Sequence, residues 1–182
     1  MKNAALQYTY EDYLALPQTG PRHQLIEGDL LLSPSPTSPH QRIVRRLLGI
    51  LSGFVESGSL GEVFCAPLDV VLSDVDVVQP DLLFVASAHR KRILRRGIQG
   101  SPDLVVEVLS EDRDMDVHVK RKLYARYGVP EYWVVDPDEE TVLLYRLRER
   151  PARPTRTYAS GDLLESPTFP GLKVPLREVF AR

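Results

Sequence analysis

The chain has 182 residues, of which 43% are hydrophobic and 26% are charged, and its formal net charge is −2. This composition excludes a disordered chain, which would be poorer in apolar residues, and a membrane protein, because charges, glycines or prolines interrupt each apolar stretch. A single cysteine, Cys65, excludes an internal disulfide framework and a cysteine-only metal cage. The length predicts one domain over residues 1–182, and without an apolar N-terminal leader we expect a soluble, cytoplasmic protein and no membrane partner.

The N-terminal part of the chain predicts a short helix followed by a β-hairpin. Thr9 is a suitable N-cap for this helix, and Pro17 is a suitable stop. Residues 24–32 contain two β-prone runs that meet at Gly28-Asp29. We expect this pair to supply the positive φ angles of a tight hairpin turn.

A long helix is predicted after the proline-rich segment 33–37. Ser38 is a candidate N-cap, Pro39 suits the first helical position, and Gly58 is a typical end. Apolar residues keep helical spacing between these points, namely Ile43, Leu47, Ile50, Leu51 and Phe54.

Short runs of β-branched, aromatic and other apolar residues follow and predict strands at 63–66, 68–72, 81–85, 103–109, 131–136 and 141–147. The run 103–109 is almost continuously apolar, which is typical of a central strand buried on both faces. A second long helix is predicted over 114–127 and a terminal helical turn over 176–180. This order favours an α/β (or α+β) fold with a mixed β-sheet flanked by helices.

Glu107 is the residue that packing does not explain, because it lies inside the most apolar of these runs. Burying an unpaired carboxylate costs on the order of several kcal/mol, so a buried acid here needs a cation, a metal or hydrogen-bond donors. The alternative is an edge strand on which Glu107 faces water.

Asp81 and Lys120 become candidate site residues if they lie close to Glu107 in the fold. Asp81 opens another apolar strand; alone it is ordinary turn chemistry, but on a neighbouring strand it would converge with Glu107 on one divalent ion. Oxygen ligands of this kind suit Mg²⁺ or Mn²⁺. Lys120 shares a helix face with Asp116 and Tyr124 at i, i+4 and i+8, and its ordinary explanation is an intrahelical pair with Asp116.

Two basic clusters are candidates for nucleic-acid contact. The first basic cluster consists of Arg42, Arg45 and Arg46, and the second lies within residues 90–96. The ordinary explanation of either is a solvated helix face, and the net negative charge argues against strong attraction of the whole protein to nucleic acid. No zinc-type histidine spacing, nucleophile elbow, Walker loop or dinucleotide fingerprint occurs, which disfavours the enzymes built on them.

Six motifs occur in a fixed order, namely Gln24-Leu25-Ile26-Glu27-Gly28-Asp29, His40-Gln41-Arg42-Ile43, Gln79-Pro80-Asp81, residues 102–110, Asp116-x-x-x-Lys120-x-x-x-Tyr124 and residues 128–136. Together they resemble the Uma2 family of bacterial proteins, described as restriction endonucleases, over about residues 10–180. The resemblance implies the restriction-endonuclease-like PD-(D/E)xK nuclease fold. It also implies that Asp81 and Glu107 are its two acids and that Lys120 is its lysine.

The activity implied by this resemblance is hydrolysis of phosphodiester bonds in DNA with Mg²⁺ (or Mn²⁺). Asp81 and Glu107 would hold the metal, and Lys120 would orient the attacking water or stabilise charge in the transition state. The first basic cluster, or the second, would follow the DNA backbone without sequence specificity. A homodimer would place two sites on two strands, although nothing in the sequence demands one.

Two positions depart from the family pattern. Leu109 occupies the place, two residues after the second acid, where the nuclease superfamily normally carries its lysine. Gln24 stands where relatives often carry Glu, which would make a metal site one charge weaker. Two alternatives therefore stay open: a catalytically silent nucleic-acid-binding or protein-interaction module on the same fold, and a phosphoesterase acting on a small nucleotide. The roles of Glu27 and His40 are also open.

Overall fold

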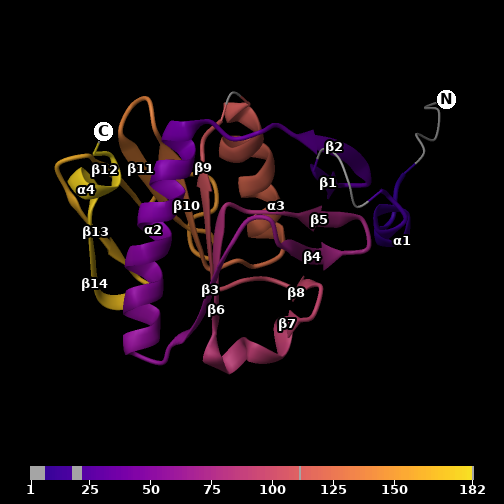
Figure 1. The fold of residues 1–182 in the computed structure, drawn as a ribbon, viewed down its shortest axis with the longest axis horizontal. Coiled ribbons are helices and arrows are strands. Elements are labelled where there is room, and N and C mark those ends of the chain that lie inside the picture. Colours follow the sequence, from indigo (N-terminus) through magenta and orange to yellow (C-terminus); the bar gives the residue numbers. More distant parts are fainter. Residues whose placement is uncertain (1–6, 18–21, 111, 182) are drawn as a thin grey trace.

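The computed structural model describes residues 7–17, 22–110 and 112–181. These residues form two six-stranded mixed sheets, a separate two-stranded hairpin and a few helices (Figure 1). The expectation of a single mixed sheet is therefore corrected: the N-terminal hairpin is the start of a sheet of its own.

The larger layer is the second sheet, which contains the apolar strand that carries Glu107. Its strand order is β12(Arg156–Ala159)-β11(Thr141–Arg146)-β10(Glu131–Asp136)-β9(Leu104–Val108)-β6(Leu82–Ala86)-β3(Gly61–Cys65). Only β9 and β10 pair in parallel, and the other pairs are antiparallel. Every residue of β9 is buried, as its near-continuous apolar run predicted, and every residue of β10 is buried as well.

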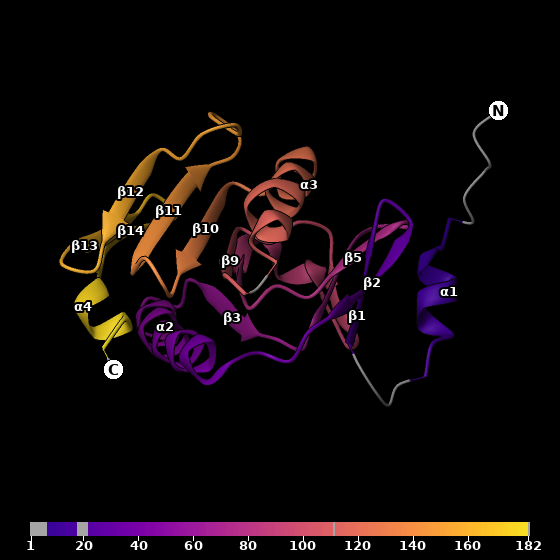
Figure 2. The same cartoon turned by 90° about the horizontal axis from the view of Figure 1, so that it is seen from above.

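The first sheet lies beside the second in both views (Figures 1 and 2). Its strand order is β2(Asp29–Ser33)-β1(Arg22–Ile26)-β5(Asp76–Val78)-β4(Asp69–Ser73)-β8(Gly97–Gln99)-β7(Ile93–Leu94). The strands β5, β7 and β8 have only three, two and three residues. A hydrophobic pattern needs a longer run to indicate a strand, and the sequence did not predict these three.

The helical elements are α1(Tyr10–Leu14), α2(Ser38–Ser57), the 3₁₀ turn η1(Ser87–Arg92), the π-helical segment η2(Met115–Lys120), α3(Arg121–Arg126) and α4(Leu176–Val179). In Figure 2, α2 and α3 lie on opposite sides of the second sheet. The hairpin β13(Leu163–Ser166)-β14(Phe169–Pro175) joins α2 on its side. No helix of the described ranges is long and apolar enough to cross a membrane.

Two apolar cores follow from the alternation of side chains along β9. Val106 packs with α2, β13 and β14 in one core, whereas Val105 and Leu109 pack with α3 and with residues of the first sheet in the other. Because strand side chains alternate between faces, Glu107 shares the face of Val105 and Leu109 and is directed toward the η2–α3 segment.

Local details of two predicted elements differ from expectation. The N-cap of α2 is Thr37, one residue earlier than predicted, and its hydroxyl accepts from His40 N at 3.4 Å. In the hairpin, positive φ angles occur at Glu27 (52°) and Gly28 (82°), whereas Asp29 already pairs with Ile26. The turn therefore lies one residue earlier than the Gly-Asp pair indicated, because strand register decides which residues close it.

Candidate active site

Asp81 and Glu107 come together because their strands are neighbours. Strands β6 and β9 are antiparallel, with Leu82 opposite Val106, so Asp81, which directly precedes β6, lies across from Glu107. The Asp81 Oδ2 accepts a hydrogen bond from the main-chain N–H of Val108 at 2.8 Å. The alternative of an exposed edge strand is excluded, since β9 lies between β10 and β6 and Glu107 is only 3% exposed.

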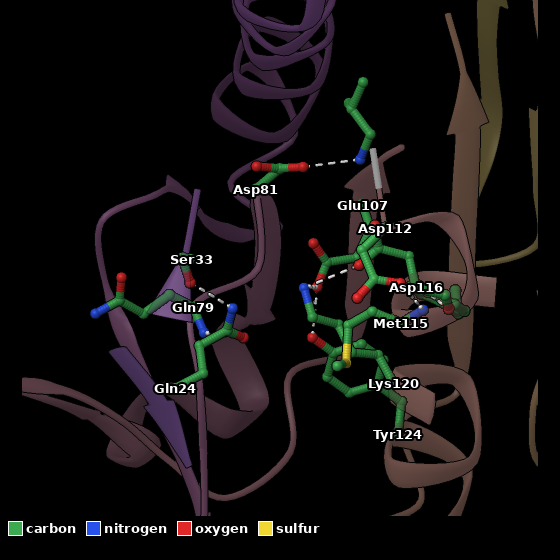
Figure 3. A network of polar contacts seen from close by, with 12 residues as sticks. Gln24, Ser33, Gln79, Asp81, Glu107, Asp112, Met115, Asp116, Lys120 and Tyr124 are labelled. Atoms are coloured by element: carbon green, nitrogen blue, oxygen red, sulfur yellow. Dashed lines mark hydrogen bonds and ion pairs between the residues drawn. The ribbon is translucent and has the colours of Figure 1, made fainter. Parts of the chain in front are cut away.

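Lys120 connects Glu107 with a second buried acid. Its Nζ lies 3.1 Å from Oε1 of Glu107 and 3.0 Å from Oδ1 of Asp116. The intrahelical pair suggested by the spacing therefore exists, and the same ammonium also reaches the strand. All three side chains are buried, which makes this an internal charge cluster (Figure 3).

The helical segment after β9 fixes the position of this ammonium. Asp116 and Lys120 belong to the π-helical η2, a widened turn of a kind that is frequent at functional sites. Tyr124 on α3 donates to Oε1 of Glu107 at 2.7 Å, and Tyr132 on β10 donates to the main-chain oxygen of Asp116 at 3.0 Å. The sequence placed Asp116, Lys120 and Tyr124 on one face but assigned no role to Asp116 or Tyr124.

The cluster contains more carboxyl groups than ammonium groups. Burial, together with the neighbouring Asp116 and Asp81, raises the pKa of Glu107 to about 8, although Lys120 opposes this shift. Burial also raises the pKa of Asp116. Burial by itself would lower the pKa of Lys120, but Glu107 and Asp116 outweigh it, so that pKa is raised and the lysine stays charged. The one ammonium thus contacts two of the three carboxyl groups directly, those of Glu107 and Asp116.

A cavity of about 120 Å³ opens over these residues and is lined from both sheets and from α2. Its lining includes Gln24, His40, Gln79, Asp81, Glu107, Asp116 and Lys120. His40 Nε2 lies 3.0 Å from Asp81 Oδ2, so this histidine belongs to the site. The signal was present in the sequence: His40 precedes Ile43, Val44 and Leu47 at helical spacing and so lies on the buried face of α2.

Gln24 and Glu27, both from the motif at the first hairpin, are placed differently. Gln24 lines the cavity, where its Nε2 donates to Ser33 Oγ at 2.8 Å and its Oε1 accepts from Gln79 N at 3.3 Å. Glu27 instead lies at the surface and pairs with Arg126. At position 24 the cavity is therefore lined by a neutral amide that its neighbours satisfy.

The oxygen donors of this cavity fit a hard divalent cation. Among the described contacts, those of Asp81 reach only Oδ2 and those of Glu107 reach only Oε1, so Oδ1 and Oε2 are the oxygens without a protein partner there. Among the residues whose placement is described, no group of three or more His, Cys, Asp or Glu side chains is arranged to hold a metal ion. Mg²⁺ typically binds through one or two carboxylates, and waters and substrate phosphates complete its shell.

The two basic clusters lie in different places. In the first, Arg42 and Arg45 are exposed on α2, whereas Arg46 donates to the main-chain oxygens of Val179 and Ala181 and so binds the C-terminal segment. The second cluster surrounds η1 and β7, at the end of β6 opposite to Asp81 (Figure 1). Only the first cluster therefore lies on the element that also brings His40 to the cavity.

The profile of the Uma2 family, described as "Putative restriction endonuclease", matches residues 10–177. A similar solved structure is the crystal structure of a "putative nuclease belonging to DUF820" from Anabaena variabilis ATCC 29413, at 24% sequence identity and a TM-score of 0.78. The match covers 95% of this chain and 97% of that chain, which shows a shared fold. A search of curated proteins found none that matches.

Proposed function

Because this chain belongs to the Uma2 family, we propose that it is a metal-dependent endonuclease that hydrolyses phosphodiester bonds in DNA. The observation that carries the proposal is the convergence of Asp81 and Glu107 on one cavity, with Lys120 Nζ 3.1 Å from Oε1 of Glu107. Two acids on adjacent strands and a lysine beside them are the arrangement that the PD-(D/E)xK nuclease fold would present.

Asp81 and Glu107 are the residues that would hold Mg²⁺ or Mn²⁺. Such an ion, when bound, polarises a phosphoryl oxygen and lowers the pKa of a coordinated water toward neutrality. The two carboxylates approach the cavity from neighbouring strands, and each has one oxygen already fixed by hydrogen-bond donors. Their remaining oxygens are therefore oriented before any ligand enters, which keeps the cost of reorganisation low.

Lys120 provides the positive charge that the reaction needs near the phosphate. Asp116 holds its ammonium at 3.0 Å, and Tyr124 holds the Glu107 oxygen that the same ammonium contacts. A cation fixed in a water-poor site stabilises negative charge that develops on phosphoryl oxygens, and it can also orient the attacking water.

DNA would approach along the start of α2. Arg42 and Arg45 are exposed there, while His40 of the same helix lines the cavity. Arginines of this kind contact phosphates and provide affinity that is independent of sequence and dependent on salt. Arg46 contributes to this surface less, because its guanidinium already binds the C-terminal carbonyl groups.

Cleavage of supercoiled plasmid tests the proposal. Wild-type protein should nick or linearise the plasmid only with Mg²⁺ or Mn²⁺, and Glu107→Gln should abolish this activity. The exposed Glu165 on β13 offers a matched control, since Glu165→Gln should leave cleavage unchanged. Activity that survives Glu107→Gln would refute the assignment, and folded wild type that neither cleaves nor binds metal would favour the silent module.

A further inference from the structure

Two nitrogen atoms from different elements contact the same oxygen of Asp81. Oδ2 accepts from the main-chain N–H of Val108 at 2.8 Å and lies 3.0 Å from Nε2 of His40. Within the described residues no donor reaches Oδ1. The carboxylate is therefore fixed in one orientation, with Oδ2 turned to the protein and Oδ1 left without a protein partner.

The burial of His40 has no other polar explanation among the described contacts. Its residue is 6% exposed, and its other ring nitrogen, Nδ1, is buried without a hydrogen-bond partner. A buried ring nitrogen without a partner lowers stability. If the ring served packing alone, an apolar side chain would fill the same space without loss of stability. Because an ionised carboxylate only accepts, we assign the proton of this contact to Nε2.

A rigid element places the ring. His40 is the third residue of the 20-residue α2, and the helix is anchored through the buried residues Ile43, Val44, Leu47, Leu51 and Val55. The N-cap Thr37 accepts from the main-chain N–H of His40 at 3.4 Å and does not contact the ring. A side chain on such a helix has little freedom to leave Asp81, which is the property that a supporting residue of a precise site requires.

We propose that His40 is a positioning residue for the metal site: with Val108 N–H it holds Oδ2 of Asp81 and so keeps Oδ1 available for Mg²⁺ or Mn²⁺. This inference rests on the proposed function. The competing explanation is that the contact only docks the start of α2 on the sheet, in which case its loss would change stability and leave the affinity for the ion unchanged.

Calorimetric titration with Mn²⁺ separates the two explanations through a pair of amide variants. The side-chain nitrogen of Gln lies as many bonds from the backbone as Nε2 of His, whereas that of Asn corresponds to Nδ1 and falls short of Asp81. His40→Asn should raise the Mn²⁺ dissociation constant by about 10- to 100-fold, and His40→Gln should stay within about threefold of wild type. Asp81→Asn gives the Mn²⁺ affinity that remains when the Asp81 carboxylate is removed.

Thr37→Ala is the control for a purely structural role. It removes the cap of α2 without touching Asp81, so it should lower the melting temperature and leave the Mn²⁺ dissociation constant unchanged. Circular dichroism verifies that each variant is folded. If His40→Asn does not fold, the Mn²⁺ dissociation constant of His40→Gln is compared with that of wild type.

The outcomes distinguish this inference from the proposed function. If wild type and His40→Asn bind Mn²⁺ equally, His40 has no positioning role, while the metal site stands. If His40→Gln or Thr37→Ala loses as much affinity as His40→Asn, the effect is structural and the inference is again overturned. If wild type itself binds no Mn²⁺, both proposals are wrong.

Discussion

The Nζ of Lys120 lies 3.1 Å from Oε1 of Glu107, so the helical segment after β9 supplies the cation that the strand itself does not carry. Leu109 directly follows β9, two residues after Glu107, and carries no charge. It shares the face of Glu107 and is 5% exposed within the core beside α3. A lysine brought in by the helix can reach the same acid because that face of β9 packs against the η2–α3 segment.

Replacing Lys120 should affect both activity and stability. Lys120→Met leaves Glu107 and Asp116 buried without their cation, which should lower the unfolding free energy by about 3 kcal/mol at pH 7. We also expect the cleavage rate to fall by about 10²-fold or more, as for the loss of a preorganised group in other active sites. Urea unfolding and plasmid cleavage measure the two effects.

Lys122 is the matched control for this experiment. It lies two residues further along on the exposed side of α3, so Lys122→Met should change stability by no more than about 0.5 kcal/mol and leave cleavage intact. Equal effects of the two substitutions would show that the buried cluster has no special role.

The raised pKa of Glu107 predicts a pH-dependent stability in metal-free protein. Its folded pKa of about 8 lies above the ordinary value of 4.5, so the folded state binds more protons than the unfolded state between these values. The unfolding free energy should therefore decrease as pH rises through this window. Urea unfolding at pH 5, 6.5 and 8 in a chelator measures this slope, and Glu107→Gln should flatten it. A slope that Glu107→Gln does not change would assign the effect to another group.

Glu131 should be a buried acid with a purely structural role. Its carboxylate accepts from Trp133 Nε1 at 2.6 Å, Ser166 Oγ at 2.8 Å and both N and Oγ1 of Thr168, and so joins β10 to the β13–β14 hairpin. Glu131→Leu should lower the unfolding free energy by about 2–4 kcal/mol because it leaves several donors unsatisfied. The Mn²⁺ dissociation constant of the folded variant should not change. A parallel loss of metal binding would contradict the purely structural role of Glu131.

DNA affinity should depend on the exposed arginines of α2. Arg42→Ala and Arg45→Ala should each weaken duplex binding and reduce the slope of log K against log salt by about 1. Fluorescence anisotropy with the Glu107→Gln background, at several salt concentrations, measures this slope without cleavage. Arg90→Ala is the control, because Arg90 belongs to η1, which follows the end of β6 opposite to Asp81, and its side chain is 80% exposed. If Arg90→Ala weakened duplex binding more than Arg42→Ala and Arg45→Ala, the second basic cluster would be the DNA-binding surface.

Local patterns in the sequence were enough to predict most elements and to single out Glu107, whereas the roles of Asp81 and Lys120 were implied by the family resemblance. The long helix α2, the buried strand β9 and the terminal helix α4 were predicted because capping residues and hydrophobic periodicity are properties of contiguous residues. Glu107 was identified because a carboxylate inside an apolar run must find a partner wherever the strand lies. The roles of Asp81, Glu107 and Lys120 in metal binding and catalysis stay predictions.

Only the tertiary structure decided which of these residues meet. Three features depend on parts of the chain that are far apart in sequence. These features are the division of the strands into two sheets, the contact of His40 with Asp81 and the binding of Arg46 to the C-terminal segment. The sequence by itself determined the elements and the residues that need partners, because these depend on neighbours along the chain. The partners were decided by long-range strand pairing and helix packing, which local periodicity does not encode.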